Sequence, residues 1–133
     1  MESIRSFFKN DRFAEFCGIE LLEVSPGHAK VRMEIKDHHL NGMGTAHGGV
    51  IFTLADFCFA VAANAHGIVA VAINTSITFT RAAHRGMLFA EASENSVNPK
   101  LGAYTVRVTD EQDEVIAIFQ GLAYRKKEKI AGA

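Results

Sequence analysis

Cysteine is scarce in this sequence. The 133 residues include only two cysteines, Cys17 and Cys58. Both fall in apolar surroundings and match no zinc or redox spacing, so we expect them to be small core residues in a reducing compartment. The histidines His38, His39 and His66 have no partner at ligand spacing, and we therefore predict no metal site.

The sequence also lacks an excess of either charge. Its net charge of −1 provides no field that would attract nucleic acid or an anionic membrane. One basic cluster, Arg125-Lys126-Lys127 with Lys129, stands out near the C-terminus. We expect it to be a solvated strand end, with contact to a phosphate-bearing ligand as the alternative.

No targeting or membrane-spanning segment is predicted. The N-terminal stretch "MESIRSFFKNDRF" has mixed charge and no apolar core of a secretory signal. The apolar segment after Gly48 approaches the length of a membrane span, but it contains Asp56 and Asn64 and lacks basic and aromatic flanks. We therefore expect a buried helix in a cytoplasmic protein.

The chain has the size and composition of one globular domain over residues 1–133. Apolar residues make up 48% and charged residues 22%, which argues against disorder. No repeat, low-complexity tract or Pro/Gly/Ser linker divides it. A short helical segment is predicted at about 2–16, with a break at Asn10-Asp11.

The rest of the pattern predicts an α+β architecture. "IELLEV", "SPGH" and "AKVRMEIK" read as two strands around a tight turn. A glycine-rich loop leads into a helix from about Gly48 to Ala65, with Gly67 as its C-cap. Three or four antiparallel strands follow, over "VAVAINTSITFT", "LFAEASENSV", "AYTVRVTD" and "EVIAIFQGLAYRK".

The long helix has apolar side chains on every face. They include Val50, Ile51, Phe52, Leu54, Phe57, Phe59 and Val61. A helix that is apolar all round must be covered all round, and one sheet of this size wraps only part of it. We therefore expect a second copy of the protein to cover the rest.

Asp56 is the one charged residue in this apolar helix. An unpaired buried carboxylate is costly, so it is either paired or used in function. Gly48-Gly49 open the helix, where unpaired N–H groups suit a developing oxyanion. Asp56 lies eight residues after Gly48, which is roughly 12 Å along a helix axis. If both act on one carbonyl, they must come from different subunits.

At this point the sequence resembles a known family. "NGMGTAHGGVIFTLAD", with Asn41 and Gly44 before the HGG and Asp56 after it, resembles the hotdog-fold acyl-CoA thioesterases of the PaaI-like, phenylacetate-degradation branch. The later "SITFTRAA" and "GLAYR" fit as well. The resemblance implies a curved antiparallel sheet wrapped around one long central helix. It also implies homodimers, or tetramers built from two dimers, with active sites between subunits and an acyl-CoA substrate.

The resemblance implies a role for each matching residue. Asp56 would be the general base or nucleophile, and the Gly48 N–H, with Gly49 beside it, would polarise the thioester carbonyl. Asn41 would hydrogen-bond the thioester or the attacking water, and His47 would fix the loop. Three further residues belong to the implied substrate-binding set: Asn74, Ser76 and Arg81. Coenzyme A would be part of the substrate, with no other cofactor.

The sequence departs from the family pattern at three positions. Asn74 stands where many relatives carry Asp, Ala72 where some carry a water-orienting Ser or Thr, and Ala82 where Pro often follows the Arg. These departures concern how the water is held and which acyl groups fit. They leave Asp56 and the glycine loop unchanged.

Structural and functional alternatives remain open from the sequence. Asp56 has a structural reading as a paired carboxylate, Asn41 as a turn former and His47 as a loop-ordering residue. Phe52, Phe57 and Phe59 are expected in the core. The expected function is thioester hydrolysis, and the alternatives are a non-catalytic CoA-ester-binding protein or a hotdog dehydratase or hydratase. The sequence does not name the acyl group.

Overall fold

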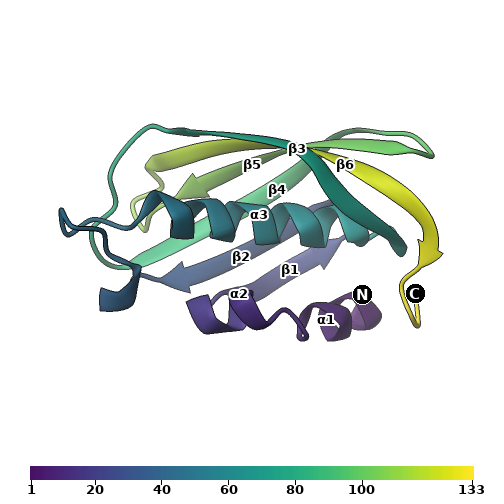
Figure 1. Cartoon of the computed structure of the whole chain (residues 1–133), viewed down its shortest axis with the longest axis horizontal. Helices are drawn as coiled ribbons and strands as arrows, with labels where there is room; N and C mark the ends of the chain where they lie inside the picture. The colour runs from purple at the N-terminus through teal and green to yellow at the C-terminus, as the bar shows by residue number, and fades with distance from the viewer.

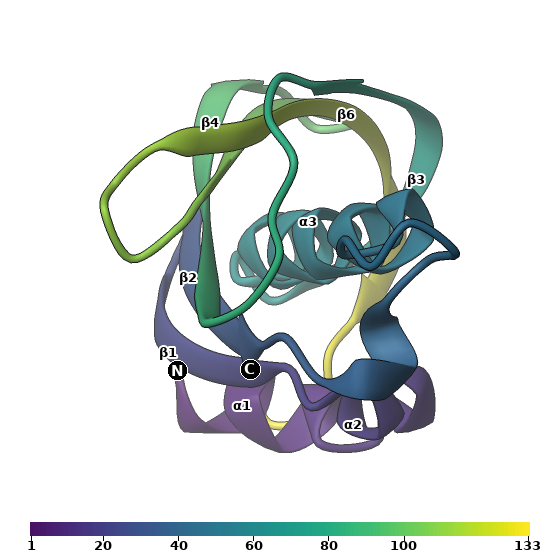
Figure 2. The same cartoon turned by 90° about the vertical axis from the view of Figure 1, so that its left-hand side faces the viewer.

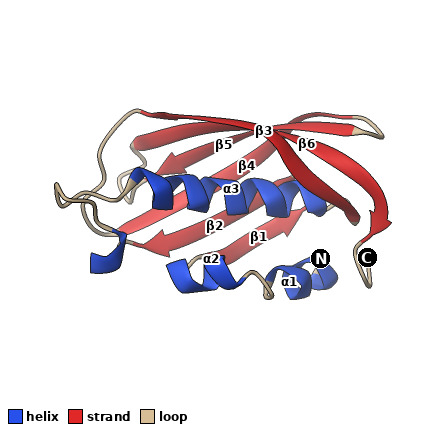
Figure 3. Cartoon of the chain, in the orientation of Figure 1, coloured by secondary structure: helices blue, strands red, loops and turns tan.

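The computed structural model describes all residues from 1 to 133 and contains the predicted elements in the predicted order (Figure 1). Two short helices precede a hairpin, and one long helix precedes four strands (Figure 3). The elements are α1 (Glu2–Phe8), α2 (Arg12–Cys17), β1 (Glu20–Ser25), β2 (His28–Glu34), the 3₁₀ turn η1 (Asp37–His39), α3 (Gly48–Asn64), β3 (Ile68–Phe79), β4 (Met87–Val97), β5 (Leu101–Thr109) and β6 (Val115–Lys129).

The six strands form one antiparallel sheet in the order β1-β2-β4-β5-β6-β3. The sheet curves over α3, while α1 and α2 lie on the side of that helix opposite β4 and β6 (Figure 2). This arrangement confirms the predicted α+β hotdog architecture. The strands β1 and β3 are the two edges of the sheet. Helix α1 lies against the β1 edge, whereas no element covers the β3 edge.

The core forms where α3 packs into the concave face of the sheet. Phe59, near the middle of α3, packs against the rings of Tyr104 and Phe119 at centroid distances of 5.5 and 5.6 Å. Gly121 permits this approach, because a Cβ at that position would lie 2.8 Å from the Phe59 ring. The predicted core role of the helix phenylalanines is confirmed, since Phe57 and Phe59 are buried and Phe52 is partly buried.

The two N-terminal helices break at Asp11, as predicted. The Asp11 carboxylate accepts a hydrogen bond from the Ala14 N–H at 3.0 Å and so caps α2. Arg5 of α1 donates to the main-chain oxygens of Leu21 and Leu22, at 3.3 and 3.0 Å. These bonds satisfy carbonyls of the β1 edge, so α1 covers an edge that would otherwise be open to pairing.

The end of α3 differs from the prediction at Gly67. The C-cap is Ala65, in a right-handed conformation, and the helix ends at Asn64. Gly67 lies two residues further on, with φ +88°, and its N–H donates to the Asn64 carbonyl at 2.9 Å. Gly67 therefore closes the turn into β3, because only that residue needs a left-handed backbone there.

Asn64 fastens the end of α3 to the start of β3. Its side chain accepts from the Ala70 N–H at 2.9 Å and donates to the Ala60 and Ala70 carbonyls at 2.8 and 3.1 Å. The Asn64 side chain therefore forms hydrogen bonds with both the N–H and the carbonyl of Ala70. Beyond Ala70, the outer edge of β3 carries the exposed apolar side chains of Val71, Ile73 and Phe79.

Both cysteines are free and buried, as predicted. Burial raises the pKa of the Cys58 thiol well above its ordinary value, and burial also raises the pKa of Cys17. Such thiols are poor nucleophiles. None of the helices has the length and hydropathy needed to cross a bilayer.

Candidate active site

The N-terminus of α3 presents one unpaired backbone donor. His47 is the N-cap, and its Nδ1 accepts a hydrogen bond from the Gly49 N–H at 2.8 Å. The Val50 and Ile51 N–H groups donate to the His47 carbonyl. The Gly48 N–H donates to no group in the chain. It is therefore the one first-turn amide available to an incoming oxygen, at the positive end of the helix dipole.

The two glycines of the HGG motif have different neighbours that a side chain would meet. A Cβ on Gly49 would lie 2.9 Å from His47 Nδ1 and would disturb the cap. A Cβ on Gly48 would lie 3.2 Å from the Phe79 ring, which is half exposed. A side chain at Gly48 would therefore press only on the half-exposed Phe79 ring, whereas a side chain at Gly49 would press on the His47 cap.

Asp56 lies on the open face of α3 and has no partner in the chain. No hydrogen bond or ion pair to its carboxylate is present, so the reading of Asp56 as a paired carboxylate does not hold within one chain. Burial, and to a lesser extent the charge of Asp11, raises the pKa of Asp56 above the ordinary 3.8. A half-buried, unpartnered carboxylate with a raised pKa is typical of a functional group.

Gly48 and Asp56 do not converge within one chain. They are separated by two turns of the same straight element, which is roughly 12 Å along the axis. Gly49, Thr53, Asp56 and Ala60 recur at helical spacing and form a stripe that the sheet leaves at least partly exposed. A carbonyl held at Gly48 is therefore out of reach of the Asp56 of the same chain.

Asn41 organises the loop that leads to this site. Its Oδ1 accepts from the Met43 and Thr45 N–H groups at 2.9 and 3.2 Å, and its Nδ2 donates to Thr45 Oγ1 at 2.9 Å. The turn-forming interpretation therefore describes what this side chain does in the chain. A hydrogen bond from Asn41 to substrate stays a prediction.

His39 supports the site structurally, and sequence reasoning did not predict this role. It is buried at 3% exposure, its Nδ1 accepts from the Lys36 N–H at 2.9 Å, and its Nε2 donates to the Cys17 carbonyl at 2.9 Å. Its own carbonyl accepts from the His47 N–H at 2.8 Å. His39 thus links α2, the end of β2 and the HGG loop. The sequence held no signal for this, because the partners are backbone groups.

Two hollows flank the N-terminus of α3. One, which we call the Arg81 hollow, has a volume of about 380 Å³ and is lined by Gly48, Ile51, Phe79 and Arg81, among others. The other, the α2 hollow, has a volume of about 210 Å³ and lies between α2 and the first turns of α3. The structure therefore brings Arg81 and Gly48 together, as the prediction of a shared substrate site requires.

Asn74 and Ser76 lie elsewhere in the chain. They are opposite Leu122 and Gln120 in the β3–β6 register and line a shallow depression together with Asn95. That depression is on the convex face of the sheet, away from α3. The structure does not bring these two residues to Gly48 or Asp56 within one chain, and their role in substrate binding stays a prediction.

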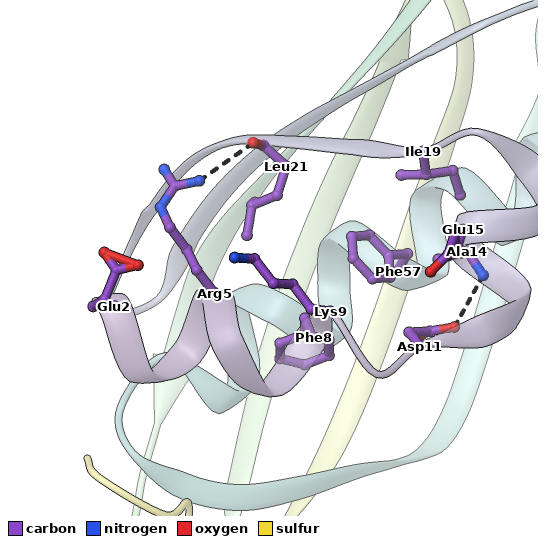
Figure 4. Close-up of a pocket in the computed structure, with 10 residues that line it drawn as sticks. All are labelled: Glu2, Arg5, Phe8, Lys9, Asp11, Ala14, Glu15, Ile19, Leu21 and Phe57. Atoms are coloured by element: carbon purple, nitrogen blue, oxygen red, sulfur yellow. Dashed lines mark hydrogen bonds between the residues drawn. The ribbon is translucent and has the colours of Figure 1, made fainter.

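A third hollow is separate from both flanks of the glycine loop. It has a volume of about 570 Å³ and lies between α1, α2 and β1 (Figure 4). Its apolar wall includes Phe8, Ile19 and Phe57, and its rim carries Lys9 and Asp11, among other charged residues. The rim mixes acids and bases, so it favours neither sign of ligand. No cluster of three or more His, Cys, Asp or Glu side chains able to hold a metal is present.

This fold and this helix terminus define a hotdog-fold protein with a single free backbone donor at the start of its central helix. Residues 43–117 match the family model described as the thioesterase superfamily. The chain belongs to that superfamily, and the enzyme class that follows is thioester hydrolase.

Individual relatives agree over nearly the whole chain. A putative esterase of Archaeoglobus fulgidus is 41% identical over 96% of this chain and 84% of its own length. The acyl-coenzyme A thioesterase PaaI of Escherichia coli is 33% identical over 98% of this chain and 94% of its own. The solved structure of E. coli PaaI, a protein of the phenylacetic acid degradation operon, superposes with a TM-score of 0.94 over 98% of this chain and 95% of that one.

Proposed function

We propose that this protein hydrolyses acyl-CoA thioesters, aryl-acyl-CoA among them, to the free acid and coenzyme A. The Gly48 N–H of one copy polarises the thioester carbonyl, and Asp56 of a neighbouring copy acts as general base or nucleophile. The similarity to E. coli PaaI, whose name states this activity, supports the substrate class. The proposed reaction uses no metal or redox cofactor.

One observation carries the proposal. An unpaired donor and an unpaired carboxylate lie on the same helix, roughly 12 Å apart along its axis, and neither has a use within its own chain. A donor at this position stabilises charge on a carbonyl oxygen, and a carboxylate of raised pKa takes a proton from water more readily than an ordinary aspartate.

The free surfaces support a site shared between two copies. The partly exposed stripe through Gly49, Thr53, Asp56 and Ala60 requires a cover. The neighbouring β3 edge spans twelve residues and exposes Val71, Ile73 and Phe79 without a covering element. A two-fold axis perpendicular to α3, placed between two such faces, runs the helices antiparallel, so that each Asp56 approaches the other copy's Gly48.

A subunit-mixing experiment tests this arrangement. We expect Asp56→Asn and Gly48→Pro each to abolish most thiol release from acyl-CoA, because each removes one of the two groups. In a mixed dimer, one site has lost both groups and the other keeps both. Random mixing therefore restores about a quarter of the wild-type activity if sites are shared across a two-fold axis.

Two results would contradict the proposal. If the two groups belonged to one chain, mixing would restore nothing, because every copy would carry a defect. If wild-type protein released no thiol from a panel of short, long and aromatic acyl-CoA substrates, hydrolysis itself would be wrong. Co-expression of differently tagged chains followed by tandem purification isolates the mixed dimers, in which one site of two is intact, so the recovered activity should rise from about a quarter to about half of the wild-type value.

A further inference from the structure

The α2 hollow has walls suited to an apolar group. Its lining includes Phe13 and Phe16 from α2, Leu40 from the loop, and Val50 and Thr53 from α3. No lysine, arginine, aspartate or glutamate side chain is part of the lining, and its polar side chains are Thr53 and three histidines, His38, His39 and His47. The hollow also includes His47 and Gly49, so it begins one residue away from the free Gly48 N–H.

Phe13 and Phe16 lie outside the buried core. α2 buries Ala14 and Cys17 against the body of the protein, whereas Phe13 and Phe16 are 61% and 74% exposed. Two exposed phenylalanines on a six-residue helix leave a large apolar area in water. Phe16 lies edge-on to the His38 ring, which also lines the hollow, at a centroid distance of 5.9 Å.

The Arg81 hollow, on the opposite flank, has the contrasting chemistry. Arg81 is exposed, and its one ionic contact, to Glu114, is long at 3.5 Å and open to solvent. Such a contact is weak, so the guanidinium remains available to an anion. Arginine is well suited to phosphate, which its planar donors bind in pairs.

A thioester of coenzyme A has two arms that leave its carbonyl carbon in different directions. One is the acyl group, and the other is the sulfur with the pantetheine chain and the phosphates. We infer that the acyl arm enters the α2 hollow, where Phe13 and Phe16 set acyl selectivity, and that the coenzyme A arm leaves past Arg81. This assignment rests on the proposed function, because it takes the carbonyl to be held at the Gly48 N–H.

The size of the α2 hollow narrows the acyl class. Its volume is about 210 Å³, and an apolar cavity of about 150 Å³ is known to hold a benzene molecule. Within one chain the hollow therefore has room for one aromatic ring or a short branched chain, and the second copy that we propose to cover Gly49 and Thr53 would form its remaining wall. A long fatty chain would extend beyond this volume.

The test uses two acyl groups on two carriers. Acetyl and phenylacetyl thioesters are compared, each on coenzyme A and on N-acetylcysteamine, a carrier without phosphates. We expect Phe13→Ala and Phe16→Ala to lower kcat/KM for phenylacetyl thioesters by about tenfold or more on both carriers, with little change for acetyl. We expect Arg81→Ala to lower kcat/KM for coenzyme A thioesters alone.

Phe7→Ala is the matched control. Phe7 is an exposed aromatic residue of α1 that is not part of the α2 hollow, and its removal should leave the phenylacetyl-to-acetyl ratio unchanged. An unchanged ratio in Phe13→Ala and Phe16→Ala, with wild-type hydrolysis intact, would overturn the acyl assignment alone. So would a loss of oligomer mass in light scattering with selectivity retained, which would make the hollow an interface between copies. An inactive wild-type protein would overturn the proposed function and this assignment together.

Discussion

Replacement of Gly48 by proline removes one N–H group and little else. Gly48 is the first residue of α3, and its N–H has no acceptor in the chain, so no helical hydrogen bond is lost. Proline is well accommodated at this first helical position. The preceding residue, His47, has φ −61° and ψ 136°, which is the extended conformation that a residue before proline prefers.

The size of the expected effect follows from the role of that N–H. Loss of one backbone or side-chain donor to an oxyanion lowers kcat by about 10²–10³, or about 2.7–4 kcal/mol. Gly48→Ala is the control, because both replacements place a Cβ 3.2 Å from the Phe79 ring. Only proline deletes the donor. The half-exposed Phe79 ring is free to shift, so we expect both variants to fold.

The assay is thiol release from an acyl-CoA under single-turnover conditions, with urea unfolding measured in parallel. We expect the rate of thiol release by Gly48→Pro to be lower than that of Gly48→Ala by a factor of about 10² or more. The unfolding free energy should be retained or slightly raised, since proline restricts the unfolded chain. If Gly48→Pro hydrolyses thioesters within a few-fold of Gly48→Ala, this N–H does not stabilise the oxyanion.

Four further predictions concern residues around the site. Asp56→Asn should lower kcat by about 10²–10⁴. It should also raise the unfolding free energy at pH 7, because the raised pKa of Asp56 means that the fold disfavours the ionised carboxylate. In urea titrations this gain in stability should vanish below pH 3.8, where the carboxyl group is protonated in both states. Asp11→Asn keeps the α2 cap but removes a charge, so the acid limb of the kcat/KM profile should move to lower pH. Burial lowers the pKa of His39 in the folded protein below the ordinary 6.5, so the neutral ring stabilises the fold fully above pH 6.5. The difference in unfolding free energy between wild type and His39→Ala should therefore shrink as the pH falls from 6.5 through the lowered pKa of the folded state. Asn64→Ala leaves two buried Ala70 backbone groups unpaired and should cost about 2–5 kcal/mol in urea unfolding, whereas exposed Asn95→Ala should cost less than about 0.5 kcal/mol.

The sequence alone determined the elements and the fold class. Alternation through β2 and the residue after it, with Val31, Met33 and Ile35 buried, and the all-round apolar helix are local patterns whose period fixes secondary structure. The residues of the HGG motif could be named for the same reason, since they are adjacent in the chain. The helix rise also set the separation of Gly48 and Asp56 before any coordinates were needed.

Only the tertiary structure decided which groups are free and which are used. The Gly49 amide is taken by His47, and the Asn41 side chain is turned into its own loop. His39 is a buried link between three segments, and β3 rather than another strand is the open edge next to α3. Hydrogen-bond partners and sheet order depend on contacts between residues far apart in the chain, and no local period carries that information.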